Sequence, residues 1–235
     1  MAAAVKETIF LDAGGVLLHP SWTRVAAVLA RHGISVDPET CAAVEPHVRK
    51  TLDLEQHRPP SDAARAAAYF DRVITRAGAR TSPDQLAAAT ADVRADHARA
   101  NLWEVVTPDA PAALARLRAA GKRIVVVSNS NGTLRAHFAK LGLAEAFDLV
   151  IDSHEEGLEK PDPRLFARAL ARAGADAATT VHVGDLYEVD VKGAQAAGIN
   201  AFLFDPGDLY RDHAPSCPRV RSLTELARRL ISGIQ

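Results

Sequence analysis

The ten residues from Ile9 to Leu18, IFLDAGGVLL, constrain the fold of this chain more than any other stretch. An apolar run of strand-forming residues ends at Asp12, two glycines follow, and apolar residues resume. This pattern is typical of a buried parallel strand with a carboxylate at its carboxyl end, where open α/β sheets bind ligands. Gly14 and Gly15 allow a sharp backbone turn beside it. We therefore expect Asp12 to lie in a site, as a nucleophile or a metal ligand.

Apolar runs and helix signals alternate from about residue 107 onward. Strands are predicted at 124–127, 149–151, 181–183 and 201–204. Helices are predicted at 108–120, 133–141, 162–174 and 189–197, and from Ser222. The first of these is expected to begin with Thr107 as its N-cap. Strands separated by single helices imply right-handed crossovers, so we predict an α/β fold with a doubly wound parallel sheet.

Residues 19–107 interrupt this alternation, because they contain helix signals and no predicted strand. The expected helices cover 22–32, 38–57 and 62–77, and a fourth begins at Ser82 with a capping box. We therefore predict an all-helical cap at 19–107, inserted into a core formed by 1–18 and 108–235. His57 and Arg58 precede two prolines and are expected in a solvated loop of this cap.

Composition excludes several classes of partner. The 235 residues contain 28 Lys and Arg against 29 Asp and Glu, a balance that argues against nucleic acid. No apolar run is long enough to span a membrane, and Lys6 and Glu7 interrupt a signal-peptide pattern. Cys41 and Cys217 lie far apart without metal-ligand spacing, which predicts free thiols and a cytoplasmic location. Neither the substrate nor the oligomeric state has a signature in the sequence.

Polar residues end three of the predicted strands, namely Asp12, Ser128 and Asp185, and Lys160 lies in a loop before a helix. Parallel strands bring such ends into one crevice. Two carboxylates in a dry crevice repel each other, so a divalent cation is expected, and Mg²⁺ suits these oxygen ligands. Lys160 and Ser128 would bind an anion beside the ion, which is what a phosphate requires.

Four segments resemble the motifs of the haloacid dehalogenase-like (HAD) hydrolase superfamily, in the subgroup with a helical cap between the first and second motifs. They are Asp12–Leu17, Val127–Asn129, Lys160–Pro163 and His182–Ala194. The fourth, HVGDLYEVDVKGA, is the most specific, and the resemblance covers essentially the whole chain. It implies a Rossmann-like core and a small phosphorylated substrate.

The resemblance also implies the reaction. Asp12 would be the nucleophile that forms an aspartyl-phosphate. Ser128 and Lys160 would be the other catalytic residues and would hold the phosphoryl oxygens, together with Asn129 of the second motif. The implied product is free phosphate, released by water from the aspartyl-phosphate.

The implied metal site contains Asp12, the carbonyl of Gly14, and Asp185. Asp190 would either bind Mg²⁺ itself or orient the residues that bind it. Gly14 departs from the pattern, because family phosphatases carry a second aspartate there as general acid and base. Glycine keeps the backbone carbonyl but cannot donate a proton. General acid–base catalysis typically contributes about 10²–10⁴-fold, so we predict a phosphatase that is slow on alkyl phosphates.

Three alternatives to a slow phosphatase stay open. Dehalogenases of the family share Ser128–Asn129 and Lys160 but lack the Gly184–Asp185 pair, because their carboxyl-ester intermediate needs no Mg²⁺. Phosphonoacetaldehyde hydrolases need a cap lysine, and Lys50 is the single lysine of the predicted cap. A catalytically weak binding protein would have no need of the nucleophile, the lysine and both aspartates of the fourth motif.

Two histidines have simpler interpretations than catalysis. His19 lies at the hinge before the predicted cap and is expected on its surface, although it is the first candidate to replace the missing proton donor. His182 lies in the middle of a predicted strand and is expected to be a packed core residue.

Overall fold

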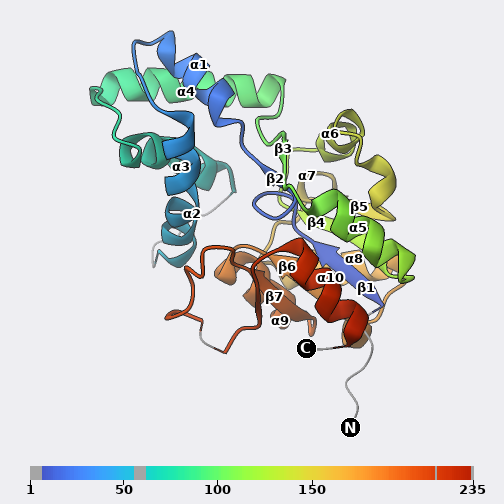
Figure 1. The fold of residues 1–235 in the computed structure, drawn as a ribbon. Helices are drawn as coiled ribbons and strands as arrows, with labels where there is room; N and C mark the ends of the chain where they lie inside the picture. The colour runs from blue at the N-terminus through green and yellow to red at the C-terminus, as the bar shows by residue number, and fades with distance from the viewer. Residues whose placement is uncertain (1–6, 56–61, 215, 234–235) are drawn as a thin grey trace. The chain divides into compact units, whose positions relative to one another are not determined.

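The structure, a computed structural model, describes residues 7–55, 62–214 and 216–233, and of residues 62–67 it describes only the backbone. The predicted cap loop with His57 and Arg58 lies outside the described residues. The chain divides into two compact units (Figure 1). The core unit comprises Met1–Leu18 and Val106–Gln235, and the helical unit comprises His19–Val105.

A six-stranded parallel sheet forms the centre of the core unit, in the order β5-β4-β1-β6-β7-β8. Its strands are β1 (Thr8–Leu11), β4 (Arg123–Ser128), β5 (Leu149–Asp152), β6 (Thr180–Gly184), β7 (Asn200–Phe204) and β8 (Arg219–Val220). The chain adds β4 and β5 on one side of β1, and then β6 to β8 on the other. This order confirms the predicted doubly wound α/β fold. The apolar residues of β1 are fully buried, as expected for the central strand of a parallel sheet.

Helices lie between these strands along the chain or follow the last of them. They are α5 (Ala110–Ala119), α6 (Leu134–Lys140), α7 (Ser153–Glu156), α8 (Pro163–Ala173), α9 (Lys192–Ala196) and α10 (Leu223–Ser232). Asp162 and Ser222 act as N-caps, since their side chains accept hydrogen bonds from the amides of Arg164 at 2.9 Å and Glu225 at 3.0 Å. The helix predicted at 189–197 begins earlier, as a π-helical turn over Tyr187–Val191, and continues as α9.

The predictions around Thr107 were wrong in two respects. Helix α5 begins at Ala110, and the Thr107 hydroxyl donates to the carbonyl of Val16 at 2.7 Å instead of capping a helix. The preceding residues form a short strand, β3 (Val105–Val106), which pairs with β2 (Leu18–His19). Thr107 is therefore held by the loop after β1, a contact that local sequence does not encode.

The helical unit contains α1 (Trp22–Ala30), α2 (Pro38–Leu54), α3 (Asp62–Arg76) and α4 (Pro83–Arg99). Ser82 caps α4 as predicted, because its hydroxyl accepts a hydrogen bond from the Gln85 amide at 3.2 Å. Aromatic rings form part of the core of this unit, with Tyr69 and Phe70 packed edge to face at 5.1 Å between centroids. The unit therefore has a hydrophobic core of its own.

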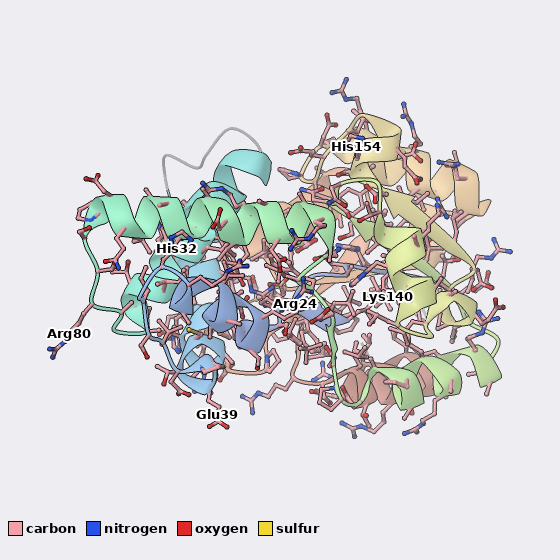
Figure 2. The ribbon with its side chains drawn as sticks, turned by 90° about the horizontal axis from the view of Figure 1, so that it is seen from above. Arg24, His32, Glu39, Arg80, Lys140 and His154 are labelled. Atoms are coloured by element: carbon pink, nitrogen blue, oxygen red, sulfur yellow. The ribbon has the colours of Figure 1, made fainter. Side chains whose placement is uncertain are left out.

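Arg24, labelled in Figure 2, joins the first helix of this unit to its last segment. Its guanidinium donates to the carboxylates of Asp96 and Glu104, both at 2.8 Å. It also donates to the carbonyls of Ala100 at 2.8 Å and Asn101 at 3.1 Å. One side chain of α1 thus satisfies carbonyls that follow the end of α4.

Both cysteines are free and buried, in agreement with the prediction. In the described part of the chain, no helix combines the length and the apolar character that crossing a lipid bilayer requires. The cytoplasmic location stays a prediction.

Candidate active site

Asp12 is fixed at the carboxyl end of β1 by the loop that follows it. Its amide donates to the carbonyl of Val183 on β6 at 2.9 Å. The loop then folds back, since the amides of Leu17 and Leu18 both donate to the Ala13 carbonyl at 2.9 Å. Gly15 has a φ of +80°, a backbone conformation that favours glycine. This tight loop holds Asp12 at the carboxyl end of the sheet, where the residue is 7% exposed.

Asp185 and Asp190 come from the segment after β6. Gly184 makes room for Asp190, because a Cβ at Gly184 would lie 2.1 Å from the Cγ of Asp190. One carboxylate oxygen of Asp190 accepts a hydrogen bond from the Leu186 amide at 3.1 Å. The carboxylate oxygens of Asp12, Asp185 and Asp190 include ligand atoms that all lie within 4.8 Å of one another. The structure therefore brings these three predicted residues together.

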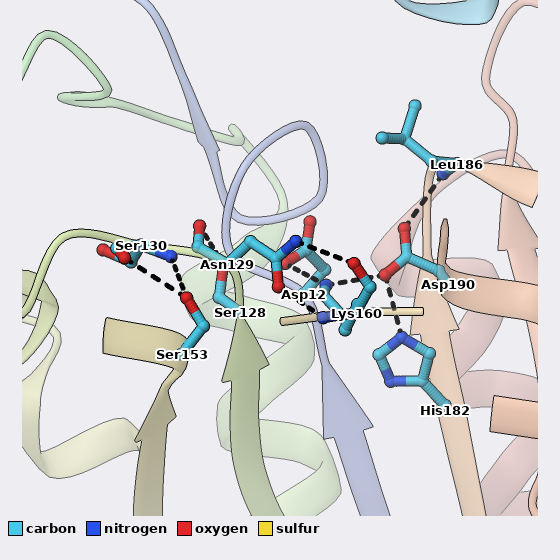
Figure 3. Close-up of polar contacts among 9 residues, drawn as sticks. All are labelled: Asp12, Ser128, Asn129, Ser130, Ser153, Lys160, His182, Leu186 and Asp190. Atoms are coloured by element: carbon cyan, nitrogen blue, oxygen red, sulfur yellow. Dashed lines mark hydrogen bonds and ion pairs between the residues drawn. The ribbon is translucent and has the colours of Figure 1, made fainter. Parts of the chain in front are cut away.

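Lys160 is the cation of this cluster (Figure 3). Its Nζ donates to Asp12 Oδ1 at 2.7 Å and to Asp190 Oδ1 at 2.6 Å, and its side chain is only 2% exposed. The peptide bond from Lys160 to Pro161 is cis. Gly193 lets α9 approach this loop, because a Cβ there would lie 2.9 Å from the Cα of Pro161. The glycines of the fourth motif thus serve the positions of Asp190 and Lys160.

Asn129 holds the backbone of Lys160. Its side-chain oxygen accepts the Lys160 amide at 2.8 Å, and its side-chain nitrogen donates to the Lys160 carbonyl at 3.1 Å. Ser128, which ends β4, is 3% exposed and its hydroxyl hydrogen-bonds Asp12. Both residues of the second motif therefore lie at the site, but the Asn129 amide group is engaged with Lys160.

Asp152 and Ser153 are site-supporting residues that sequence reasoning missed. The Ser153 hydroxyl accepts the Ser130 amide at 3.0 Å and donates to the Ser130 carbonyl at 3.2 Å. Asp152, fully buried at the end of β5, accepts the amide of Gly132 at 3.0 Å. Together they fix the loop after β4. Their sequence signal is the same as that of Asp12, namely polar residues that directly follow an apolar run.

His182 was predicted to be a packed core residue, and it is fully buried on β6. Its Nε2 also lies 3.1 Å from Asp190 Oδ1, the same oxygen that accepts Lys160. A hydrogen bond from a strand residue to a helical-turn residue eight positions later depends on how β6 and that turn fold together. The sequence pattern did not indicate this contact.

Burial and charge oppose each other in the cluster. Burial raises the pKa of the Asp12 carboxyl, and the neighbouring Lys160 ammonium and Ser128 hydroxyl only partly offset it. Burial also acts to raise the pKa of Asp190, but the Lys160 ammonium and the His182 hydrogen bond outweigh it and hold the pKa below its ordinary value. The pKa of Lys160 is raised despite its burial, because two carboxylates surround the ammonium.

The donor set fits a magnesium ion. Three carboxylates and one ammonium carry a formal charge of −2 when all are ionised, and the Asp12, Asp185 and Asp190 oxygens are close enough to share one ion. Hard divalent cations prefer such oxygen ligands. A magnesium ion would balance this charge in a buried place where it is otherwise unfavourable.

His19 and Lys50 belong to the helical unit and are not members of this cluster. Burial and the nearby Arg49 guanidinium lower the pKa of His19, while Glu45 opposes them. Lys50 is half-buried on α2. Among the described residues, the core-unit cluster is therefore the place where the predicted chemistry assembles.

Comparison with known proteins identifies the family. A family model for haloacid dehalogenase-like hydrolases matches residues 6–198. The chain is 30% identical to haloacid dehalogenase-like hydrolase domain-containing protein 3 of Homo sapiens, over 94% of this chain and 89% of that protein. It is 39% identical to ribulose-1,5-bisphosphate 5-phosphatase of Halopiger xanaduensis, over 44% of each chain. It is 41% identical to phosphoserine phosphatase of Thermus thermophilus, over 43% of this chain and 41% of that one. The match thus spans less than half of either phosphatase.

Solved structures share the fold along nearly the whole chain. YfnB of Bacillus subtilis, solved bound to magnesium, superposes with a TM-score of 0.70 at 19% identity, over 96% of this chain and 98% of that one. A 2-haloacid dehalogenase of Pseudomonas syringae superposes with a TM-score of 0.58 at 22% identity, over 98% and 100%. At these identities the similarity establishes the fold alone.

Proposed function

Because the chain belongs to the haloacid dehalogenase-like hydrolase family, we propose that it is a magnesium-dependent phosphatase acting on a small phosphorylated metabolite. The observation that carries this proposal is the buried cluster in which Lys160 contacts Asp12 and Asp190, with Asp185 beside them. Such a cluster offers a nucleophile, a cation for phosphoryl oxygens and oxygen ligands for a metal in one place. The phosphatase relatives support the same class of substrate.

In the proposed reaction, a carboxylate oxygen of Asp12 attacks phosphorus, and the bond from phosphorus to the leaving oxygen breaks. Lys160 and Ser128 hold the phosphoryl oxygens. To do so, Lys160 would have to give up part of its contact with Asp12. Its ammonium would still be paired, because it also donates to the carboxylate of Asp190. Water then attacks the aspartyl-phosphate, which frees Asp12 and phosphate.

The proposed metal ligands are Asp12, Asp185 and the carbonyl of Gly14. When bound, a magnesium ion would neutralise charge on the phosphoryl oxygens. Asp190 accepts hydrogen bonds from Lys160, His182 and the Leu186 amide. These three bonds favour an orienting role for Asp190 over a ligating one.

The buried carboxylates argue against two of the three alternatives, the dehalogenase and the binding protein. Asp185 lies within ligand distance of Asp12, an arrangement that a dehalogenase of this family does not need. A binding protein would gain nothing from a buried nucleophile held by a lysine. We further propose that the helical unit, His19–Val105, is the cap that selects the substrate.

A panel of phosphorylated metabolites, assayed for phosphate release with Mg²⁺, tests the proposal. We expect release from at least one member with the wild type and none above background with Asp12→Asn. The matched control is Asp162→Asn, which changes a carboxylate of the third motif that caps α8, is 27% exposed and is not a member of the cluster. Equal rates for wild type and Asp12→Asn would contradict the proposed nucleophile.

Calorimetric titration with Mg²⁺ tests the metal site without any substrate. Replacing a charged oxygen ligand by an amide weakens binding, so the affinity of Asp185→Asn should fall well below that of the wild type. Equal affinity would remove Asp185 from the site.

Phosphoserine and ribulose bisphosphate are suitable first members of the substrate panel, because two relatives are phosphatases named for these compounds.

A further inference from the structure

We infer that His182 is a positioning residue that sets the place of Lys160 through Asp190. The residues form one buried series, in which His182 contacts Asp190, Asp190 contacts Lys160, and Lys160 contacts Asp12. Every member is less than 10% exposed. The kinetic part of this inference rests on the proposed phosphatase function, and the spectroscopic part does not.

The geometry fixes the direction of the hydrogen bond. Asp190 Oδ1 is a carboxylate oxygen that already accepts Lys160, so His182 Nε2 must be the donor. The other ring nitrogen, Nδ1, is buried and has no hydrogen-bond partner among the described residues. The series therefore requires the imidazole form that carries its proton on Nε2.

The surroundings hold both side chains in one orientation. The His182 ring meets the ring of Phe166 edge to face, with 5.0 Å between centroids. Asp190 occupies the space left open by Gly184 and is fixed at its other oxygen by the Leu186 amide. His182 is thus the side-chain donor that turns Oδ1 toward Lys160. Without it, we expect the carboxylate to rotate and the ammonium to lose one of its two anchors.

A packing role would predict different behaviour from a positioning role. A residue that only fills space can be replaced by an apolar side chain of similar size with little effect on catalysis. A residue that donates to Asp190 needs a donor at the same place. His182→Gln keeps an N–H near the position of Nε2, whereas His182→Leu removes it.

Steady-state kinetics with the best substrate of the panel separates the two roles. We expect kcat/KM to fall about 10–100-fold in His182→Leu, the size typical for loss of a hydrogen bond to a charged group, and to recover largely in His182→Gln. The matched control is Thr180→Val. Thr180 lies on the same strand and face as His182 and is equally buried. Its substitution removes a hydrogen bond of 2.7 Å from the Thr180 hydroxyl to the Asp176 carbonyl, which is not part of the cluster. Its kcat should change less than about twofold.

A double-variant cycle tests whether His182 acts through Asp190. If it does, His182→Leu combined with Asp190→Asn should be no slower than Asp190→Asn alone, within about twofold. Multiplying losses, or equal activity of His182→Leu and wild type, would overturn the inference. So would a Gln variant as slow as the Leu variant while both melt at the temperature of the wild type.

Nitrogen NMR of ¹⁵N-histidine-labelled wild type gives a readout that needs neither activity nor a stable Leu variant. We expect the resonance assigned through His182→Gln to show a ring that carries a proton on Nε2, and this resonance to move in Asp190→Asn. A ring protonated on Nδ1 alone would overturn the inference. If the panel yields no phosphate release while the resonance is as expected, the proposed function fails and the positioning contact stands.

Discussion

Gly14 is the residue at which this chain departs from the pattern of the family phosphatases that it resembles. It lies two residues after the proposed nucleophile, in the loop that Gly15 allows to turn back on β1. Glycine at this point leaves the backbone carbonyl for a metal and removes the side chain that would protonate a leaving oxygen. If no other residue supplies the acid, we expect the leaving group to depart as an anion and the rate to depend steeply on its basicity. Aryl and acyl phosphates are expected to turn over faster than alkyl phosphates.

Gly14→Asp should restore the missing acid. We expect turnover of alkyl phosphates to rise by up to about 10²–10⁴-fold, provided that the new carboxyl reaches the leaving oxygen, and turnover of aryl phosphates to change much less. Phosphate release from p-nitrophenyl phosphate and from a sugar phosphate measures both. Gly14→Asn is the control, since it adds the same volume without an acid. Wild-type hydrolysis of alkyl phosphates as fast as that of aryl ones would show that another residue, with His19 as the first candidate, donates the proton.

Gly184 has a steric role that substitution should reveal. A Cβ at this position would lie 2.1 Å from Asp190 Cγ and 2.5 Å from its Oδ2, so Gly184→Ala must displace the Asp190 carboxylate. We expect loss of phosphatase activity and a decrease in the free energy of unfolding of about 1–3 kcal/mol, the usual range for overpacking. Urea unfolding measures the latter. Gly207→Ala is the control, because the nearest atoms to its new methyl group would belong to the flexible Leu209 side chain, the nearest at 3.2 Å. A fully active Gly184→Ala would contradict the tight contact.

Among the elements, a network around Arg24 connects the first helix of the helical unit to its last segment. Arg24 on α1 contacts Asp96 near the end of α4 and Glu104 beyond it. Burial acts to raise the pKa of Asp96, but the Arg24 and Arg99 guanidiniums outweigh it, so the pKa lies below its ordinary value of 3.8. A carboxyl with a lowered folded-state pKa stabilises the fold above that ordinary value. This contribution is lost as the pH falls through the folded-state pKa.

Arg24→Met should therefore destabilise the protein in a pH-dependent way. At pH 7 we expect a decrease in the free energy of unfolding of about 1–3 kcal/mol, because several hydrogen bonds to a charged group are lost. The difference from wild type should shrink as the pH is lowered from 5 toward 3. Thermal unfolding followed by circular dichroism at several pH values measures it. Arg99→Met is the comparison, since Arg99 is 74% exposed and its pair with Asp96 should contribute less than that of Arg24. A difference that stays constant down to pH 3 would contradict the role of Asp96.

For the molecule as a whole, the separation into two units predicts which residues a bound ion stabilises. All proposed metal ligands lie in the core unit. Hydrogen exchange with and without Mg²⁺ should show slower exchange at the loop after β1 and at the turn after β6, because a ligand stabilises the part that binds it. Amides of α2 and α4 serve as internal controls and should be unchanged. Slower exchange throughout residues 19–105 would show that the ion also stabilises the helical unit.

The fold was predictable because its signals are local. Apolar runs of strand length, separated by helix signals with N-caps such as Asp162 and Ser222, specify a doubly wound sheet. Asp12, Ser128 and Asp185 were predictable for the same reason, since each directly ends such a run. Their meeting in one crevice follows from the parallel sheet.

The contacts that support the site were not predictable from local pattern. His182 was assigned to the core correctly, but its bond to Asp190 depends on the fold of the turn after β6. Thr107 was expected to cap a helix, but its hydroxyl donates to the carbonyl of Val16, 91 residues earlier. Asn129 was expected at phosphate, and its amide group holds the Lys160 backbone, 31 residues later. Such partners are set by which strands lie side by side.

The central place of β1 has a consequence for the order of events during synthesis. Thr8 pairs with Arg123 on one side and with Thr180 on the other, so the strand of this sheet that is synthesised first is among the last to be enclosed. Its apolar residues have no strand partner in this sheet until β4 is made, and Asp12 meets Lys160 only after 148 further residues. Strand pairs that are distant in sequence form slowly, and hydrophobic surface stays exposed until they have formed. The nascent chain should therefore depend on chaperones until β6 has emerged, and a ribosome-bound fragment that stops before β6 should remain sensitive to protease.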